Sequence, residues 1–241
     1  MGHSLFISDL HLCESRLEIM NDFVGFLTNT ASHAENLYIL GDLFEYWPGD
    51  DVIATGAFAD VINGLQALAN RGVNLFLIHG NRDFLLGEQF SELTKVRLLP
   101  DPHLVTLYDT AILLSHGDTL CTDDTDYQAF RATVRNDKWI TDFLDQPLYA
   151  RITYIESIRK KSEVEKSIKS MEIMDVNQYA VESLLKKFDY PPLFIHGHTH
   201  RPNRHQYLID GHRCERCVLG DWYEHGSFLK LDTNGIHEHS L

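Results

Sequence analysis

Several things that this 241-residue sequence lacks narrow its possible functions. It has four cysteines, too few for a disulfide framework in a chain of this length, so we expect a reduced, cytosolic protein. No apolar run reaches the roughly 18 residues that a membrane-spanning helix needs. The first residues show no basic segment that leads into an apolar one, so we expect no secretory signal.

Positive charge is also scarce. The sequence has 21 Lys and Arg residues against 35 Asp and Glu residues, which gives a net charge of −14. A general nucleic-acid binder needs clustered Lys and Arg to neutralise phosphates, so we expect no nucleic-acid partner. No Gly-rich phosphate loop follows an apolar run, which argues against a dinucleotide-binding fold or a P-loop. The sequence indicates no obligate protein partner.

The composition and the apolar pattern are typical of an α/β protein. Hydrophobic residues make up 44% of the chain and charged residues 23%, an ordinary balance for a globular domain. Residues 17–32 and 57–70 carry apolar side chains at helical spacing. Near-continuous apolar runs, which suit strands buried on both faces of a sheet, lie at 5–7, 37–40, 75–78, 111–114 and 193–195. Strands that alternate with helices predict an α/β sheet architecture.

The segment from 125 to 175 has a different pattern. Strand-like runs stop, Pro147 suits a helix start, and nine basic residues stand against seven acidic ones between 126 and 169. Apolar side chains recur there at helical spacing in three stripes: Tyr127, Phe130 and Val134; Leu148, Ile152 and Ile155; and Val164, Ile168 and Met171. We expect an inserted helical cap at 125–175 on a core formed by 1–124 and 176–241. The alternative is an ordinary helical subdomain that packs its stripes inward.

Five polar clusters follow apolar runs, where the expected strands end. They are Asp9-Leu10-His11, Gly41-Asp42, Gly80-Asn81-Arg82-Asp83, His116-Gly117-Asp118 and His196-Gly197-His198-Thr199-His200. Ligands of α/β sheets bind at the carboxyl ends of the strands, so these clusters can converge on one crevice. Carboxylate and amide oxygens with imidazoles suit Mn²⁺, Fe, Zn²⁺ or Co²⁺. Seven such donors are too many for one tetrahedral ion and suit two neighbouring ions.

Spacing and order strengthen the metal hypothesis. Asp9-x-His11 and His198-x-His200 each separate two donors by two positions, which on a strand puts both side chains on one face. Taken alone, each cluster has an ordinary structural explanation, since Gly, Asp and Asn favour turns and a single His is usually a satisfied, partly buried residue. All five clusters in order, each closing an apolar run, favour a catalytic site.

Other conspicuous residues have simpler interpretations. Cys214-x-x-Cys217 is a single pair without a second one, and is therefore weak evidence for Zn²⁺. Asp83 and Asp118 are expected to support the site or to cap helices, and Asp83 precedes a helix-like stretch that it could cap. Three residues are expected to pack rather than to bind a ligand: Trp47, Trp139 and Trp222.

The five clusters together resemble the signature of the calcineurin-like metallophosphoesterases. The resemblance covers essentially the whole chain and implies an α/β sandwich of mixed sheets flanked by helices, with an inserted helical cap. It also implies two Mn²⁺ ions that share one carboxylate. The implied ligands of one ion are Asp9, His11, Asp42 and His200; those of the other are Asp42, Asn81, His116 and His198. A non-catalytic scaffold of this fold usually loses ligands, whereas all seven are present here.

Longer motifs resemble one branch of that superfamily. They are Gly41-Asp42-Leu43-Phe44, His79-Gly80-Asn81-Arg82-Asp83-Phe84, His116-Gly117-Asp118-Thr119-Leu120-Cys121 and Ile173-Met174-Asp175-Val176-Asn177-Gln178. The branch hydrolyses the pyrophosphate of UDP-2,3-diacylglucosamine, a lipid-linked UDP-sugar, in lipid A biosynthesis. The resemblance implies attack of a metal-activated hydroxide on the α-phosphorus. The implied substrate contacts are Asn81, Arg82, Asp124, Ser162, Lys166, Lys169 and His198.

Arg82 stands where many members of the wider superfamily have a histidine that protonates the leaving group. An arginine gives up no proton readily but clamps a phosphate through two N–H groups. It therefore favours an anhydride, whose phosphate leaving group needs little protonation. The expected catalytic residues are Asp42, Asn81, Arg82, His116 and His198.

The cap would shelter acyl chains against its apolar stripes, and Arg159, Lys160 and Lys161 would contact anionic headgroups. We therefore expect a cytoplasmic protein attached peripherally to the cytoplasmic side of the inner membrane. The alternative substrate is a soluble nucleotide diphosphate or a cyclic nucleotide.

Overall fold

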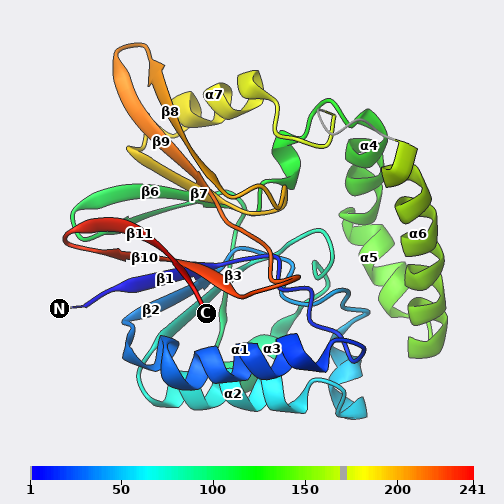
Figure 1. Cartoon of the computed structure of the whole chain (residues 1–241). Helices are drawn as coiled ribbons and strands as arrows, with labels where there is room; N and C mark the ends of the chain where they lie inside the picture. The colour runs from blue at the N-terminus through cyan, green and yellow to red at the C-terminus, as the bar shows by residue number, and fades with distance from the viewer. Residues whose placement is uncertain (1, 169–172) are drawn as a thin grey trace.

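Two β-sheets pack face to face at the centre of the computed structural model, which describes residues 2–168 and 173–241, and the side chains of all of these except 161–168 (Figure 1). The first sheet has the order β11-β10-β1-β2-β3-β4, formed by Gly235–Ser240, Ser227–Asp232, Ser4–Ile7, Asn36–Ile39, Asn74–Ile78 and Arg97–Leu99. The second has the order β5-β6-β7-β9-β8, formed by His103–Leu107, Thr110–Ser115, Leu193–His196, His212–Val218 and Asn203–Ile209. Both sheets mix parallel and antiparallel pairs.

The strands form where the apolar runs were found, so those predictions are confirmed. β1 and β7 are buried along their whole length, because each has one face toward the other sheet and one toward a helical layer. Between the sheets, the ring of Tyr38 stacks between those of Phe6 and Phe76, with centroids 5.1 and 4.7 Å apart. These rings pack against side chains of β6 and β7, which belong to the second sheet.

Helices cover the two outer faces (Figure 1). The first sheet is covered by α1, α2 and α3, formed by Leu17–Asn29, Ala59–Asn70 and Glu88–Thr94. The second sheet is covered by α7, Gln178–Lys187. The helices predicted at 17–32 and 57–70 are confirmed with shorter bounds. Short 3₁₀ helices lie at Ala31–His33, Asp50–Thr55 and Asp118–Leu120.

The cysteine pair and two tryptophans serve packing. Cys214 packs toward α7 and Cys217 packs between the sheets, so the two thiols point to opposite faces of β9 and do not share a site. Burial raises the pKa of both thiols, that of Cys217 to about 12. Trp47 and Trp222 are buried, as predicted.

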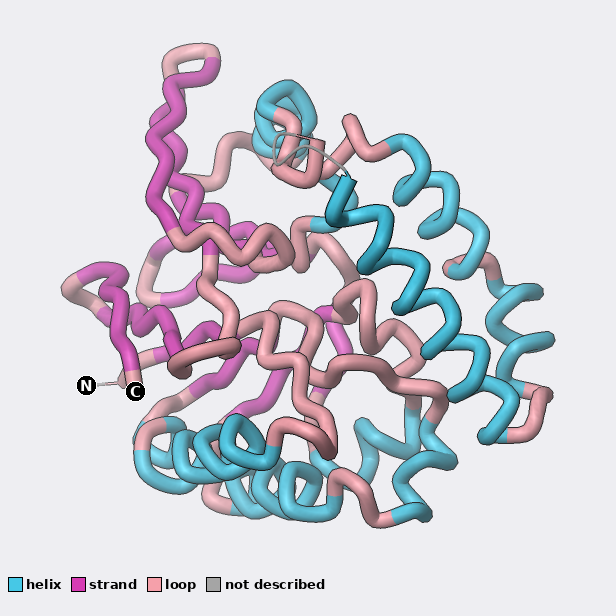
Figure 2. The backbone as a smooth tube through the Cα atoms, turned by 45° about the vertical axis from the view of Figure 1, so that its right-hand side comes forward, coloured by secondary structure: helices cyan, strands magenta, loops and turns pink. Residues whose placement is uncertain are grey.

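Three further helices stand beside the carboxyl ends of the strands (Figures 1 and 2). They are α4, α5 and α6, formed by Thr125–Val134, Asp137–Leu144 and Leu148–Ile168. The predicted helical character and the start after Pro147 are confirmed. The structure adds two details that the stripes did not show. α5 carries a stacked pair, Trp139 and Phe143. The second stripe and the described part of the third belong to one helix, because no Gly or Pro interrupts 148–168; Met171 lies outside the described residues.

Arginines fasten this helical group to the rest of the chain. From α4, the Arg131 Nε atom donates to Asp118 Oδ2 at 2.6 Å, and Arg135 donates to the Gly80 carbonyl at 2.8 Å. From α6, the buried Arg151 donates to the Pro48 carbonyl and pairs with Asp51. Because each contact is charge-assisted, these contacts fix the helices at the edge of the ligand loops. Of the helices in the described part of the chain, none has both the length and the apolar character needed to span a bilayer.

Candidate metal centre

The loops that follow β1, β2, β3, β6 and β7 bring all seven predicted metal ligands together. The β1 loop is held against the β2 loop by hydrogen bonds from the Asp9 amide to the Gly41 carbonyl, 3.1 Å, and from the His11 amide to the Asp42 carbonyl, 3.0 Å. The β2 and β3 loops approach so closely that a Cβ on Gly80 would overlap the Asp42 carboxylate. This glycine is therefore required for the approach of the two loops.

The backbone of these loops differs from the prediction. The Asp-x-His and His-x-His pairs were expected on strands, which is wrong: their residues lie in loops and have positive φ, as does Asp42. The φ values are 56° for Asp9, 51° for His11, 52° for Asp42, 67° for His198 and 55° for His200. Non-glycine residues avoid this region, and each costs of order 1–3 kcal/mol. Five such residues at one place indicate a site that is held against local preference.

The first group of donors is Asp9, His11 and His200. The Nε2 atoms of His11 and His200 are 3.2 Å apart, and Asp9 Oδ1 lies 4.0 and 3.2 Å from them. Asp42 Oδ2 lies 3.9 Å from His11 Nε2. All four ligands implied for one ion therefore face a common point.

The second group is Asp42, Asn81, His116 and His198. Asp42 Oδ2 lies 3.8 Å from His116 Nε2. Asn81 Oδ1 lies 3.0 Å from His116 Nε2 and 2.9 Å from His198 Nδ1. Because the same Asp42 oxygen is near His11 and near His116, it stands between the two groups.

The residues fit divalent cations. Asp9 Oδ2 accepts from Ser8 Oγ and the His198 amide, while Asp9 Oδ1 is buried and accepts no aligned hydrogen bond from the described residues. Single donor atoms of Asp9, His11 and His200 all lie within 4.8 Å of one another, and so do those of Asp9, Asp42 and His116. Donors about 2.1 Å from one ion lie roughly 3–4 Å from each other, as these do.

The imidazoles are oriented from behind. The Nδ1 atom of His116 lies 2.8 Å from the Leu40 carbonyl, and that of His200 lies 3.3 Å from Asp221 Oδ2. These partners leave both Nε2 atoms directed at the donor groups, which is the arrangement expected behind metal-binding histidines.

Proton affinities in the cluster follow from its crowded charges. Burial alone would lower the pKa of His116, but Asp42 and Asp9 outweigh it and raise the pKa to about 9. Asp221 and Asp9 likewise outweigh burial and raise the pKa of His200 to about 9. Burial and the nearby His116 lower the pKa of His198 to about 4. Protons on His116 and His200 neutralise the carboxylates, so cations that bind here would displace these protons.

Two buried aspartates support the loops. Asp83 accepts from the Leu43 amide at 2.7 Å and the Gly80 amide at 2.9 Å, and so ties the β2 and β3 loops together. It is not the N-cap of the next helix, because α3 begins only at Glu88, after Gly87. Burial and the charge of Asp42 raise the pKa of Asp83 to about 6.

Asp118 supports the second group from the α4 side. It accepts from the Tyr127 hydroxyl at 2.7 Å and from Arg131, and the Tyr127 ring stacks on His198 with centroids 5.9 Å apart. Tyr127 was predicted only as part of an apolar stripe, and the stripe pattern does not show which strand loop the helix meets, so this contact was not predicted.

A second set of contacts missed from sequence surrounds Glu45. Its Oε1 atom lies 3.3 Å from Arg82 and 2.7 Å from Arg159, and its Oε2 atom lies 3.3 Å from His11 Nδ1. Arg159 was expected to face lipid headgroups, which is wrong in this structure because its guanidinium turns inward to Glu45. Arg82 also donates its backbone N–H to Asp42 Oδ1, at 2.8 Å.

Of the remaining predicted substrate contacts, the structure describes the side chain of Asp124 alone. Asp124 caps α4, where it accepts from the Tyr127 amide at 3.1 Å. Ser162 and Lys166 lie on α6, but their side chains are outside the described set, and Lys169 lies outside the described residues altogether. The predicted substrate contacts of Ser162, Lys166 and Lys169 therefore stay predictions.

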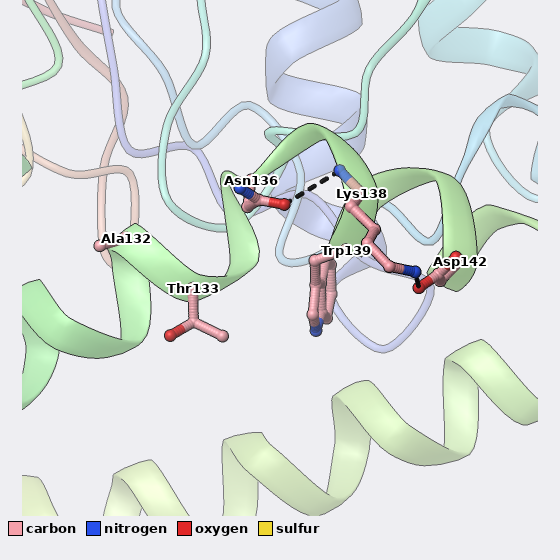
Figure 3. Close-up of a pocket in the computed structure, with 6 residues that line it drawn as sticks. All are labelled: Ala132, Thr133, Asn136, Lys138, Trp139 and Asp142. Atoms are coloured by element: carbon pink, nitrogen blue, oxygen red, sulfur yellow. Dashed lines mark hydrogen bonds and ion pairs between the residues drawn. The ribbon is translucent and has the colours of Figure 1, made fainter.

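A hollow of about 490 Å³ opens beside α4 and α5 (Figure 3). It is lined by Ala132, Thr133, Asn136, Lys138, Trp139 and Asp142. The Trp139 ring points toward α6, where its centroid lies 6.3 Å from that of Tyr154. A hollow with an aromatic wall is a surface that apolar groups could use.

Relatives with assigned names resemble this chain along nearly its whole length. It is 51% identical to the UDP-2,3-diacylglucosamine hydrolase of Aromatoleum aromaticum, covering 96% of this chain and 94% of that protein. It is 49% identical to the protein of the same name from Haemophilus influenzae strain PittGG, covering 98% and 97%. The protein of that name from Stenotrophomonas maltophilia strain R551-3 is 46% identical, with 96% of each chain covered.

A solved structure and a family model agree on the fold. An archaeal phosphodiesterase superposes with a TM-score of 0.50 at 13% identity and 99% coverage of both chains, a likeness that concerns the fold alone. The family model described as calcineurin-like phosphoesterase matches residues 3–202, a span that contains all seven predicted ligands. The chain therefore belongs to the calcineurin-like phosphoesterase family.

Proposed function

We propose that this chain hydrolyses the pyrophosphate bond of UDP-2,3-diacylglucosamine, a step of lipid A biosynthesis, and releases UMP and 2,3-diacylglucosamine 1-phosphate. The observation that carries the proposal is one centre of oxygen and nitrogen donors in a chain 46–51% identical, over nearly its full length, to proteins named for that substrate. A phosphoesterase family supplies the reaction class.

The two donor groups define the proposed metal sites. One ion would be held by Asp9, His11, Asp42 and His200, and the other by Asp42, Asn81, His116 and His198. Oxygen and imidazole donors without thiolate suit Mn²⁺, which we propose as the metal. When bound, a pair of such ions supplies a water of lowered pKa and neutralises charge on phosphoryl oxygens.

The protein's own groups would bind and orient the phosphates. Arg82 is anchored to Asp42 through its backbone, and its side chain, 20% exposed, pairs with Glu45, which also contacts His11. There it can bind two oxygens of one phosphate. The leaving group of an anhydride is itself a phosphate and needs little protonation, so an arginine suits this position better than a proton donor.

The helical group at 125–175 would act as a cap on the core formed by 1–124 and 176–241. Its apolar surface, with the hollow at Trp139 and the partly exposed Phe130, would receive acyl chains, since such chains gain free energy when they leave water. Lys160, which is exposed on α6, would contact anionic headgroups at the cytoplasmic side of the inner membrane.

The test compares substrates with the Mn²⁺-loaded protein. Turnover of UDP-2,3-diacylglucosamine should exceed that of UDP-N-acetylglucosamine, which lacks the acyl chains, and that of bis-p-nitrophenyl phosphate, which lacks the anhydride. In oxygen-18 water the label should appear in UMP, because the proposed attack is on the α-phosphorus. Faster turnover of the diester, or label in the sugar phosphate, would contradict the proposal.

Membrane attachment has a separate test. Flotation with vesicles that contain anionic lipid should bring the protein to the top of the gradient, and K160E should weaken that recovery. Recovery that is equal for the two proteins would remove Lys160 from the proposed contact.

A further inference from the structure

Glu45 is a buried acidic residue that lies between three functional regions of the chain. It follows β2 by six positions, and only 7% of its surface is exposed. Its neighbours come from the β1 loop, the β3 loop and helix α6: His11, Arg82 and Arg159. A buried carboxylate with three nitrogen groups around it is costly to place without a role, since its desolvation must be offset by each of those contacts.

The contact with His11 concerns the metal site. A histidine that gives Nε2 to a metal carries its proton on Nδ1, and a buried N–H needs an acceptor. His11 Nδ1 is buried and has no aligned hydrogen-bond partner among the described residues, and Glu45 Oε2 stands 3.3 Å from it. Glu45 therefore occupies the position behind His11 that Asp221 occupies behind His200.

The contacts with the two arginines concern the phosphate side. Arg82 and Arg159 both approach Oε1, at 3.3 and 2.7 Å, although one belongs to the β3 loop and the other to α6. Two guanidinium groups that meet at one oxygen would repel each other without it. With Glu45 between them they retain one net positive charge beside the donor groups, which favours a bound phosphate.

We propose that Glu45 is a positioning residue that sets the ring of His11 through Oε2 and holds Arg82 and Arg159 side by side through Oε1. One carboxylate thus links the proposed metal site, the proposed phosphate clamp and helix α6. The part that concerns the arginines rests on the proposed function, because it needs a phosphate substrate. The part that concerns His11 does not.

The experiment uses three variants of the full chain. E45Q keeps the size of the side chain but replaces one acceptor oxygen by a donor, which cannot serve His11 and two arginines together. E45D keeps the charge on a shorter side chain. E92Q is the matched control, because Glu92 is exposed on α3. After chelation, Mn²⁺ is titrated into each protein without substrate, and free Mn²⁺ is followed by electron paramagnetic resonance.

The proposal expects E45Q to weaken Mn²⁺ binding at one of two sites by about 10–100-fold, the usual cost of losing a partner behind a metal ligand. E45D should recover part of the affinity, and E92Q should bind like the unmodified chain. Wild-type affinity in folded E45Q or E45D would overturn the role toward His11. If E45Q fails to fold, E45D alone decides, since its shorter carboxylate cannot reach all three partners.

Steady-state kinetics test the other half. R159M should raise KM for UDP-2,3-diacylglucosamine while Mn²⁺ affinity stays unchanged, whereas E45Q should change both. An unchanged KM in both variants would overturn the role toward the arginines. If the unmodified chain does not hydrolyse this substrate, the proposed function fails, yet the Mn²⁺ titrations still decide the role toward His11.

Discussion

The Nε2 atoms of His11 and His200 lie 3.2 Å apart, although 189 positions separate the two residues in the chain. Two imidazole lone pairs that face each other at this distance repel unless a proton or a cation lies between them. The nearby carboxylate oxygens of Asp9 and Asp42 make a divalent cation the fitting occupant. The pairing of distant residues therefore carries more chemical information than either histidine alone.

Replacement of His200 by alanine should empty one of the two proposed sites. We expect bound Mn²⁺ to fall from two ions per chain toward one, and kcat/KM to fall by more than about 100-fold, since even residues behind metal ligands cost 10–100-fold. Elemental analysis and steady-state kinetics would measure both. H33A is the control, because His33 is an exposed residue on a 3₁₀ turn. Two ions still bound to H200A would contradict the assignment.

Arg82→Lys should keep the charge but lose the planar fork that binds two phosphate oxygens. A charge-assisted hydrogen bond contributes about 1.5–3 kcal/mol, so kcat/KM should fall by roughly 10–150-fold. R213K, at an exposed position on β9, should leave kinetics unchanged. Equal activity of R82K and the unmodified chain would show that Arg82 does not clamp a phosphate.

Arg131→Met should destabilise the fold, because it leaves the buried Asp118 carboxylate without its cation. The Tyr127 hydroxyl still donates to Asp118, so we expect a loss of about 3 kcal/mol, near the lower end for a broken buried pair. Urea denaturation would measure it, with R213M as a surface control that stays within about 0.5 kcal/mol. If the two variants unfold at the same urea concentration, the Asp118 contact contributes little to stability.

His196 should make stability depend on pH. It is fully buried, its Nε2 atom accepts a hydrogen bond from Arg216 at 2.9 Å, and burial together with the charge of Arg216 lowers its pKa to about 3. The unfolded chain binds a proton near pH 6.5 whereas the folded chain does not until about pH 3. The lowered pKa of His196 therefore costs no stability above pH 6.5. As pH falls from 6.5 toward 3, the free energy of unfolding falls by up to about 1.4 kcal/mol per pH unit.

The measurement compares the unmodified chain with H196Q in chelator by urea denaturation at several pH values. The difference between their unfolding free energies should shrink or reverse from pH 6.5 to 4, because glutamine does not titrate. Parallel pH curves for the two proteins would show that His196 is not held neutral.

Much of the fold could be predicted because its strands are short, apolar and buried on both faces. β1 and β7 have that pattern, and polar clusters mark where each of them ends. The helix boundaries in 125–175 were harder. α5 buries Phe143 against the core, yet its polar residues dilute the stripe, so the helix escaped notice.

The convergence of the seven predicted ligands could also be predicted, but the backbone geometry that achieves it could not. The positive φ of Asp9 and His11 goes with backbone hydrogen bonds to the β2 loop, whereas the spacing alone suggested strands. Asp83 looked like a helix cap because helix-like residues follow it, and only the meeting of the β2 and β3 loops gives it other partners. Glu45 shows no local pattern, since all three of its partners are remote in sequence.

In the proposed site two cations share the Asp42 carboxylate. Anomalous diffraction at the manganese edge, from crystals grown with Mn²⁺, would show both ions and their positions. We expect two peaks about 3.5–4 Å apart, with Asp42 between them and one imidazole pair on each side. A single peak, or two peaks of which one lies beyond the reach of Asp42, would contradict it.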